Sequence, residues 1–283
     1  MESRVTRRFE KLAAQQRAGF VAFVTANDPT PEVFSQILEG LPVAGVDVIE
    51  IGMPFSDPMA DGPAIQLSTQ RALKAGVSLP GILDSVARLR EWEMDTPIIL
   101  MGYYNPIYAY GVERFCEQAA NAGVDGVIIV DMPPEEAPEL LHHLAANNMH
   151  MIFLSAPTTS DARLPAVLEH ASGFLYYVSI TGITGTGSAA TSDIEAAVKR
   201  LKSHTDLPVA VGFGIKTPDQ AAAVAQVADA AVVGSSIVEQ ISAGLDEEGQ
   251  PEPGLAPKVL EFVRDLATAV RTARETAKEE QST

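Results

Sequence analysis

The chain of 283 residues is 46% apolar and carries a formal net charge of -17 at pH 7. This length and composition suit one large α/β domain or two small ones, with a substantial buried core. The acidic balance offers no basic stripe for nucleic acid or for an anionic membrane surface, so a small anionic substrate would have to be held by local backbone N–H groups.

The N-terminal segment, residues 1–19, is basic and lacks the apolar centre of a secretory signal. No uncharged apolar run approaches the roughly 20 residues that a membrane helix needs. The one cysteine, Cys116, excludes an internal disulfide and fits a packing role in a reducing compartment. We therefore expect a cytoplasmic protein that binds neither membrane nor nucleic acid.

Apolar runs bounded by Gly, Pro or Asp predict eight strands, each followed by a segment of helical periodicity. Helical segments are predicted over 57–76, from Pro218 onward, and from Pro257 to about Ala277. Eight βα units in a chain near the usual barrel size of about 250 residues predict a (β/α)8 TIM barrel. We expect one domain over residues 1–283, with an N-terminal helical segment and a frayed C-terminal tail. The alternative, an open doubly wound sheet, lacks a Gly-x-Gly-x-x-Gly after the first strand. The predicted strands are 20–25, 47–52, 98–102, 126–130, 151–155, 174–179, 208–212 and 230–234.

The second strand carries a carboxylate near its end. Alternation places Val48, Glu50 and Gly52 on one face and Ile49 and Ile51 on the other. If the two isoleucines pack against helices, Glu50 points into the barrel, where active sites lie at the carboxyl ends of the strands. A buried Glu satisfied by a neighbouring hydroxyl or amide is the alternative to an acid/base role.

Other carboxylates follow the strands, with a structural alternative for each. Asp61, before Gly62 and Pro63, could cap a helix or take part in the chemistry. Asp57 has the same ambiguity, and Asp131 could either hold a turn or touch a substrate.

Two other kinds of chemistry have little support in the sequence. A Schiff-base lyase needs a desolvated lysine on a strand, and the predicted strands contain none; only Lys216 lies near the expected rim. The histidines fall in helical or connecting segments or, for His150, before the fifth strand, so no metal site is predicted. Of the chemistries considered, acid/base catalysis by carboxylates is the one that the sequence supports.

Glycine-rich segments follow the last three strands: 182–185, 212–215 and 234–236. Glycines let backbone N–H groups approach an anion, and 234–236 leads into a short predicted helix whose N-terminus favours phosphate. We therefore predict a phosphate site at the carboxyl ends of the later strands, as is common in such barrels.

These segments together resemble the tryptophan synthase alpha chain family. The segment Pro-Phe-Ser-Asp-Pro-Met-Ala-Asp-Gly-Pro over 54–63 is its most specific motif, and the similarity runs from residue 20 to the last helix. The resemblance implies retro-aldol cleavage of indole-3-glycerol phosphate to indole and glyceraldehyde 3-phosphate, without metal. It assigns proton transfer to Glu50 and acceptance of the indole N–H to Asp61. Further residues are implied for the indole pocket (Phe23, Met101, Tyr176, Thr184 and Phe213) and for the phosphate (Gly185, Gly214, Gly234 and Ser235).

The resemblance also implies a partner and a moving loop. The partner is a tryptophan synthase beta chain in an α2β2 complex, contacted through Pro54, Asp57 and Asn105. That chain carries the pyridoxal phosphate, so no cofactor is expected on this one. Residues 183–192 would form a lid over the substrate. Two departures are the absence of an arginine from 180–192 and Asn27 in place of a common glycine.

Overall fold

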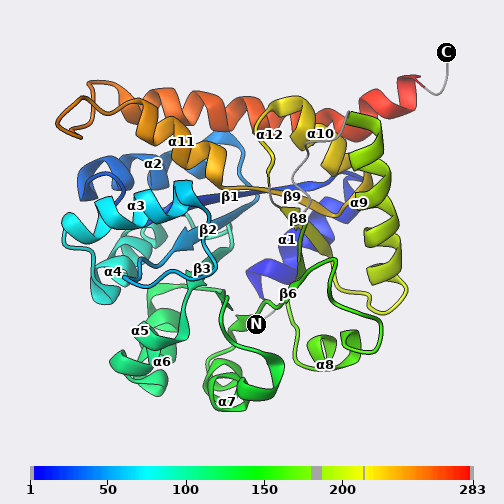
Figure 1. Cartoon of the computed structure of the whole chain (residues 1–283), viewed down its shortest axis with the longest axis horizontal. Helices are drawn as coiled ribbons and strands as arrows, with labels where there is room; N and C mark the ends of the chain where they lie inside the picture. The colour runs from blue at the N-terminus through cyan, green and yellow to red at the C-terminus, as the bar shows by residue number, and fades with distance from the viewer. Residues whose placement is uncertain (1–2, 180–186, 213, 281–283) are drawn as a thin grey trace.

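The computed structural model describes residues 3–179, 187–212 and 214–280. A parallel sheet lies at the centre with helices around it, and the long last helix runs along one side (Figure 1). The strands are β1 (Gly19–Thr25), β2 (Val48–Gly52), β3 (Ile98–Gly102), β4 (Gly126–Ile129), β5 (His150–Met151), β6 (Leu154–Ser155), β7 (Leu175–Val178), β8 (Val209–Gly212) and β9 (Ala230–Val233). The helices are α1 (Arg4–Ala14), α2 (Pro31–Ala44), α3 (Pro63–Lys74), α4 (Leu79–Arg90), α5 (Tyr104–Tyr110), α6 (Val112–Ala122), η1 (Pro134–Glu136), α7 (Pro138–Ala146), α8 (Leu164–Glu169), α9 (Gly187–Lys202), α10 (Pro218–Val227), α11 (Ser235–Ala243) and α12 (Leu255–Glu280).

The sheet closes on itself. The strand order is β5-β4-β3-β2-β1-β9-β8-β7-β6, and β5 and β6 are the two ends of one stretch, residues 150–155. On one side of this stretch, the Ile152 N–H donates to the Val127 carbonyl at 3.0 Å. On the other side, the Phe153 carbonyl accepts from the Tyr176 N–H at 3.1 Å. The predicted (β/α)8 barrel is therefore confirmed, with its fifth predicted strand divided into two short pieces.

The segment after the second strand differs from the prediction. The helix expected over 57–76 begins only at Pro63, and residues 53–62 form a loop. Proline suits the first position of a helix because its missing N–H would have no partner there. The longer gap between the second and third strands holds a second helix, α4. The last helix, α12, is longer than predicted at both ends.

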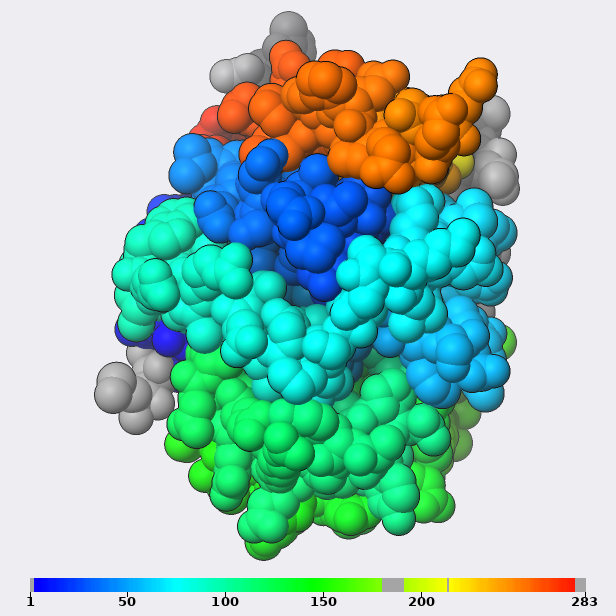
Figure 2. Space-filling model, turned by 90° about the vertical axis from the view of Figure 1, so that its left-hand side faces the viewer, coloured from blue at the N-terminus to red at the C-terminus, as the bar shows by residue number. Residues whose placement is uncertain are grey.

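Helices cover the outside of the barrel, and alternation along the strands separates outer from inner side chains. In β2, Ile49 and Ile51 belong to the outer apolar layer under the helices, whereas Val48 belongs to the inner one. In Figure 2 the residues coloured from blue to green cover one side of the molecule, below the orange residues around the start of α12. The predicted inward direction of the Glu50 side of β2 is thus confirmed.

The first helix, α1, closes the N-terminal end of the barrel. Val5, Phe9 and Leu12 are buried against the inner layer, and the Phe9 ring lies 5.5 Å from the ring of Phe174. This end is filled with apolar side chains, so an open space for a ligand is left at the carboxyl end of the strands. No helix among the described residues is both long and apolar enough to cross a membrane.

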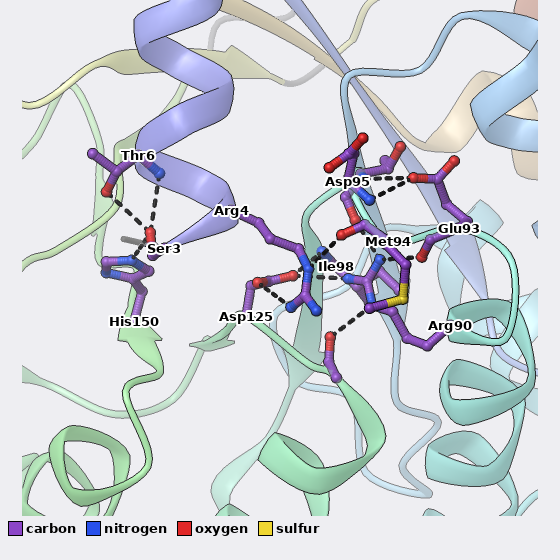
Figure 3. A network of polar contacts seen from close by, with 12 residues as sticks. Ser3, Arg4, Thr6, Arg90, Glu93, Met94, Asp95, Ile98, Asp125 and His150 are labelled. Atoms are coloured by element: carbon purple, nitrogen blue, oxygen red, sulfur yellow. Dashed lines mark hydrogen bonds and ion pairs between the residues drawn. The ribbon is translucent and has the colours of Figure 1, made fainter. Parts of the chain in front are cut away.

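A polar network fastens α1 to the base of the barrel (Figure 3). Asp125 accepts from Arg4 at 3.0 Å, from Arg90 at 2.9 Å and from the Ile98 N–H at 2.9 Å. The side chain of Arg90 is 7% exposed and that of Asp125 is 5% exposed. On the other side of α1, the Ser3 hydroxyl lies 2.7 Å from Nε2 of His150.

We expect Asp125→Asn to lower the free energy of unfolding by about 3 kcal/mol, because it leaves the Arg90 charge buried without its counterion. The matched control is Asp161→Asn, which breaks the exposed Asp161–Arg200 pair and should cost less than about 1 kcal/mol. Equilibrium unfolding in urea measures both. Equal losses in the two variants would contradict the importance of this network.

Candidate active site

A cavity of about 140 Å³ lies at the carboxyl end of the barrel. Its wall comes from strands far apart in the sequence and from the loop between β2 and α3. The lining residues are Phe23, Thr25, Glu50, Gly52, Met53, Ala60, Asp61, Gly62, Ile65, Thr69, Met101, Gly102, Tyr103, Val130, Tyr176, Gly214, Ile215, Val232, Gly234 and Ser235. The structure therefore brings together Glu50 and Asp61 with six of the other predicted site residues.

Glu50 lies at the centre of this wall. It pairs in register with Phe23 on β1 and with Ile99 on β3, and only 1% of its surface is exposed. Among the described residues, none forms a hydrogen bond with its buried Oε2. The alternative of a buried Glu held by a neighbouring hydroxyl or amide is therefore not supported at this oxygen.

Burial raises the pKa of the Glu50 carboxyl from 4.5 to about 8. Removing a carboxylate from water without a nearby cation or hydrogen-bond donor disfavours the charged form. At neutral pH the group is mostly protonated, and it can both donate a proton and take one back near pH 7. These are the properties of a general acid/base.

Asp61 lies on the loop of residues 53–62, across the mouth of the cavity. The N-cap of α3 is Gly62, which has no side chain to form a cap hydrogen bond. The capping interpretation of Asp61 is therefore wrong, because Asp61 precedes the N-cap, and it lines the cavity instead. Burial raises the pKa of Asp61 above its ordinary 3.8, and a hydrogen bond from Tyr103 opposes this rise.

Apolar and aromatic side chains complete the wall between the two carboxyls. Phe23, Met101 and Tyr176 line the cavity as predicted. Close packing of the aromatic rings requires glycines: a Cβ at Gly52 would lie 2.5 Å from the Phe23 ring, and one at Gly212 would lie 2.5 Å from the Tyr176 hydroxyl. Burial, with the nearby Glu50 carboxyl, raises the pKa of Tyr176 well above its ordinary value, so its hydroxyl stays neutral.

Two of the three glycine-rich segments meet at the wall of the cavity. Gly214, Gly234 and Ser235 all line it. The Ser236 hydroxyl donates to the Ile215 carbonyl at 3.0 Å and so joins the segment after β8 to the start of α11. The N-cap residue of α11 is Gly234, which has no side chain to form a cap hydrogen bond, so among the described residues the N–H groups of the first turn are available to an anion.

Some predicted residues fall outside this cavity or outside the described chain. Thr184, Gly185 and Phe213 lie outside the described residues. Of the predicted lid, residues 183–186 lie outside the described chain, and the rest is helical from Gly187 onward, where α9 begins. Pro54 is half-buried, Asp57 and Asn105 are exposed, and none of them lines the cavity.

Two other candidates have structural roles. Asp131 accepts from the Tyr104 N–H at 2.9 Å and so holds the start of α5. Lys216 is exposed and lies 3.9 Å from Glu239. Among the described residues that line the cavity there is no lysine.

Several lining residues were not predicted, and strand alternation could have found some of them. Tyr103 is two positions after Met101, on the same face of β3 and just past its end. Val130 and Val232 likewise lie near the carboxyl ends of β4 and β9. Ile65 and Thr69 give no such signal, because they come from α3 and reach the cavity only through its packing against the barrel.

Fold and cavity together define a barrel of the enzyme type, with two carboxyl groups in a cavity at the carboxyl ends of its strands. The comparisons with known proteins agree with this class. The family model for the tryptophan synthase alpha chain matches residues 9–270. The chain therefore belongs to the tryptophan synthase alpha chain family. In this family the alpha subunit, a carbon–carbon lyase, cleaves indole-3-glycerol phosphate, and the indole passes to a beta subunit.

Similar proteins span almost the whole chain. The tryptophan synthase alpha chain of Caulobacter vibrioides (strain NA1000 / CB15N) is 55% identical over 273 residues, which are 96% of this chain and 98% of the relative. The tryptophan synthase alpha chain of Gluconacetobacter diazotrophicus is 53% identical over 272 residues, which are 96% of this chain and 99% of the relative. The crystal structure of tryptophan synthase subunit alpha from Legionella pneumophila superposes with a TM-score of 0.87 at 36% identity. The match covers 95% of this chain and 99% of that one.

Proposed function

We propose that Glu50 and Asp61 carry out the cleavage of indole-3-glycerol phosphate in this chain. The reaction breaks the bond between indole C3 and the glycerol side chain. It needs a proton at C3, removal of a proton from the side-chain hydroxyl next to the breaking bond, and stabilisation of positive charge at the indole nitrogen. The bond electrons return to the ring as the hydroxyl becomes the aldehyde of glyceraldehyde 3-phosphate, so that the proton taken up and the proton released balance.

The observation that carries this proposal is the buried Glu50 carboxyl with a pKa of about 8 in a cavity that also contains Asp61. A protonated Glu50 can donate its proton to C3, and the carboxylate that results can accept the proton of the side-chain hydroxyl. One residue can serve both steps because the second restores the proton lost in the first. The apolar wall around it excludes water, which strengthens each charge interaction.

Asp61 would accept the indole N–H. When C3 is protonated, the ring nitrogen becomes positive, and a carboxylate held beside it stabilises that charge more than it stabilises the neutral substrate. An interaction that strengthens in the transition state lowers the barrier rather than only tightening binding. Phe23, Met101 and Tyr176 would hold the ring, together with Thr184 and Phe213.

The phosphate would bind at the start of α11. The positive end of the helix dipole and the N–H groups of its first turn favour an anion there, despite the acidic charge of the whole chain. Gly214, Gly234 and Ser235 surround this point, and Gly185 would join them. Binding of the phosphate here and of the indole N–H at Asp61 would orient the substrate with its indole toward the loop of residues 53–62.

The partner would be a beta chain that carries pyridoxal phosphate, in an α2β2 complex. The surface near Pro54, Asp57 and Asn105 supports this proposal because two large apolar side chains are exposed close by in the sequence, Met59 and Tyr108. We further propose that residues 1–283 form one domain, since α1 and α12 both pack onto the barrel. A cytoplasmic location fits the single buried thiol of Cys116.

Indole release from indole-3-glycerol phosphate by the purified chain tests the lyase proposal. We expect slow release by the chain alone and a sharp rise when a pyridoxal-phosphate beta chain is added, because docking next to the loop of residues 53–62 can order the cavity. The control is the beta chain alone. A folded chain that releases no indole in either condition would refute the proposed function.

A further inference from the structure

Tyr103 is a buried aromatic residue between β3 and α5 that neither the proposed chemistry nor the sequence motifs use. It is 3% exposed and lines the cavity. Its ring lies 5.4 Å from the ring of Phe55, on the loop of residues 53–62. β3 therefore supports this loop directly through Tyr103.

The hydroxyl of Tyr103 accepts a hydrogen bond from the Ala60 N–H at 2.9 Å, which places it next to Asp61 on the loop. Burial raises the pKa of Tyr103 to about 12, so the hydroxyl keeps its proton. Because a lone pair is used at Ala60, that proton is available to the Asp61 carboxyl, whose pKa Tyr103 lowers against the effect of burial.

The loop has little other support near Asp61. Ala60 and Met59 are exposed, and the nearest backbone bond is the Asp61 N–H to the Pro58 carbonyl at 3.2 Å within the loop itself. Gln66 donates to the Asp61 carbonyl at 2.7 Å, which fixes the main chain but not the carboxylate. Among the described residues, Tyr103 is the side chain whose hydroxyl is placed beside this carboxylate, through its hydrogen bond from the Ala60 N–H.

We infer that Tyr103 is a positioning residue for Asp61. The Tyr103 hydroxyl holds the Asp61 carboxylate in the direction of the indole nitrogen. The inference rests on the proposed function for the identity of the substrate, but the contact between the two side chains does not. The hydroxyl acts only through Asp61 and need not touch the substrate. A tyrosine suits this task because its rigid ring places one polar atom at a fixed distance from β3.

The test is Tyr103→Phe, which keeps the ring and removes only the hydroxyl. Hydrogen bonds to charged groups contribute about 1.5 kcal/mol or more, so kcat for indole formation should fall roughly tenfold with little change in KM. Loss of the hydrogen bond should also raise the pKa of Asp61, since burial then acts unopposed. Because the reaction needs ionised Asp61, activity should be lost at a higher pH than in the wild type as the pH falls.

The matched control is Tyr104→Phe. Tyr104 is the next residue, and its hydroxyl donates to Glu139 at 3.2 Å on the exposed side. This variant also loses one tyrosine hydroxyl, from the residue next to Tyr103. Neither its kcat nor its pH profile should change. In an Asp61→Asn background, Tyr103→Phe should cost much less than it does in the wild type. Equal costs in the two backgrounds would mean that Tyr103 acts otherwise than through Asp61.

A second measurement separates this inference from the proposed function. In protein with 13C-labelled aspartate carboxyls, the Asp61 signal is identified by its loss in Asp61→Asn, and its titration is followed by NMR. A midpoint that moves up in Tyr103→Phe but not in Tyr104→Phe supports the contact even if the wild type releases no indole. An unmoved midpoint overturns the inference whatever the activity.

Discussion

Glu50→Gln should abolish indole formation and at the same time make the protein more stable. The substitution keeps the shape of the side chain and removes the group that transfers the proton. Loss of a general acid/base costs about 10²-fold to 10⁴-fold on its own, and here one residue serves two proton transfers, so turnover should fall below detection. Binding of a beta chain should be unchanged, because Glu50 is buried inside the barrel.

The gain in stability follows from the pKa of Glu50. The pKa of Glu50 is about 8 in the folded protein, against its ordinary value of 4.5 in an unfolded chain. Between pH 4.5 and pH 8 the unfolded chain therefore releases a proton that the folded chain keeps. Stability from this group is therefore fully present below pH 4.5 and is lost as the pH rises toward 8. Glutamine has no such loss, and at pH 7 Glu50→Gln should raise the free energy of unfolding by roughly 3 kcal/mol.

Urea unfolding at pH 5 and pH 8 measures this effect, because the two proteins should differ little at the lower pH and much more at the higher. Glu117→Gln, the same substitution at an exposed position of α6, is the control and should change neither activity nor stability. If Glu50→Gln kept most of its turnover, Glu50 could not be the group that transfers the protons. A stability difference that does not grow with pH would show that Glu50 is ionised in the folded protein.

The strands and the inward side of Glu50 could be predicted because local pattern decides them. Parallel strands buried on both sides read as short apolar runs between Gly, Pro and Asp, and such runs occur once per βα unit here. In β2 a carboxylate between two isoleucines can only face inward once Ile49 and Ile51 pack under helices. The phosphate site that we propose at the start of α11 follows from the same rule, since Gly234 comes directly after β9 and Ser235 begins a helix.

The role of Asp61 could not be settled from pattern, because the contact that decides it is long-range. In sequence, Asp61-Gly62-Pro63 fits a helix start as well as a catalytic loop. In the structure, Gly62 takes the N-cap position and the Asp61 carboxyl turns to Tyr103, 42 positions further along the chain. The division of the fifth strand has a similar origin, since residues 150–155 bond to β4 at one end and to β7 at the other.

The two carboxyls illustrate how one cavity can give similar groups different electrostatic surroundings. Burial raises the pKa of both, but Glu50 has no donor at Oε2 among the described residues and its pKa reaches about 8, whereas Tyr103 opposes the rise at Asp61. A carboxyl that stays protonated can act as an acid, and one that stays ionised can stabilise a cation. Burial of the Glu50 carboxyl lowers the stability of the protein near neutral pH. Replacing Glu50 with glutamine should therefore stabilise the fold.

Asp61→Asn should lower turnover much more than substrate affinity. Asparagine keeps an oxygen that can accept the indole N–H, so the neutral substrate binds almost as before. It lacks the negative charge that would stabilise the positive ring nitrogen after C3 is protonated, so kcat should fall by about 10²-fold while KM changes less than about threefold. Steady-state kinetics of indole release measure both values.

Asp84→Asn, an exposed aspartate on α4 far from the cavity lining, is the control for the loss of one negative charge and should leave both constants unchanged. The acid limb of the pH profile provides a further check. In the wild type, activity should decline as Asp61 becomes protonated, and in Asp61→Asn that limb should disappear because residue 61 no longer titrates. A rise in KM alone, with kcat intact, would mean that Asp61 binds the indole without acting on its transition state, and Glu50 would then have to account for the chemistry by itself.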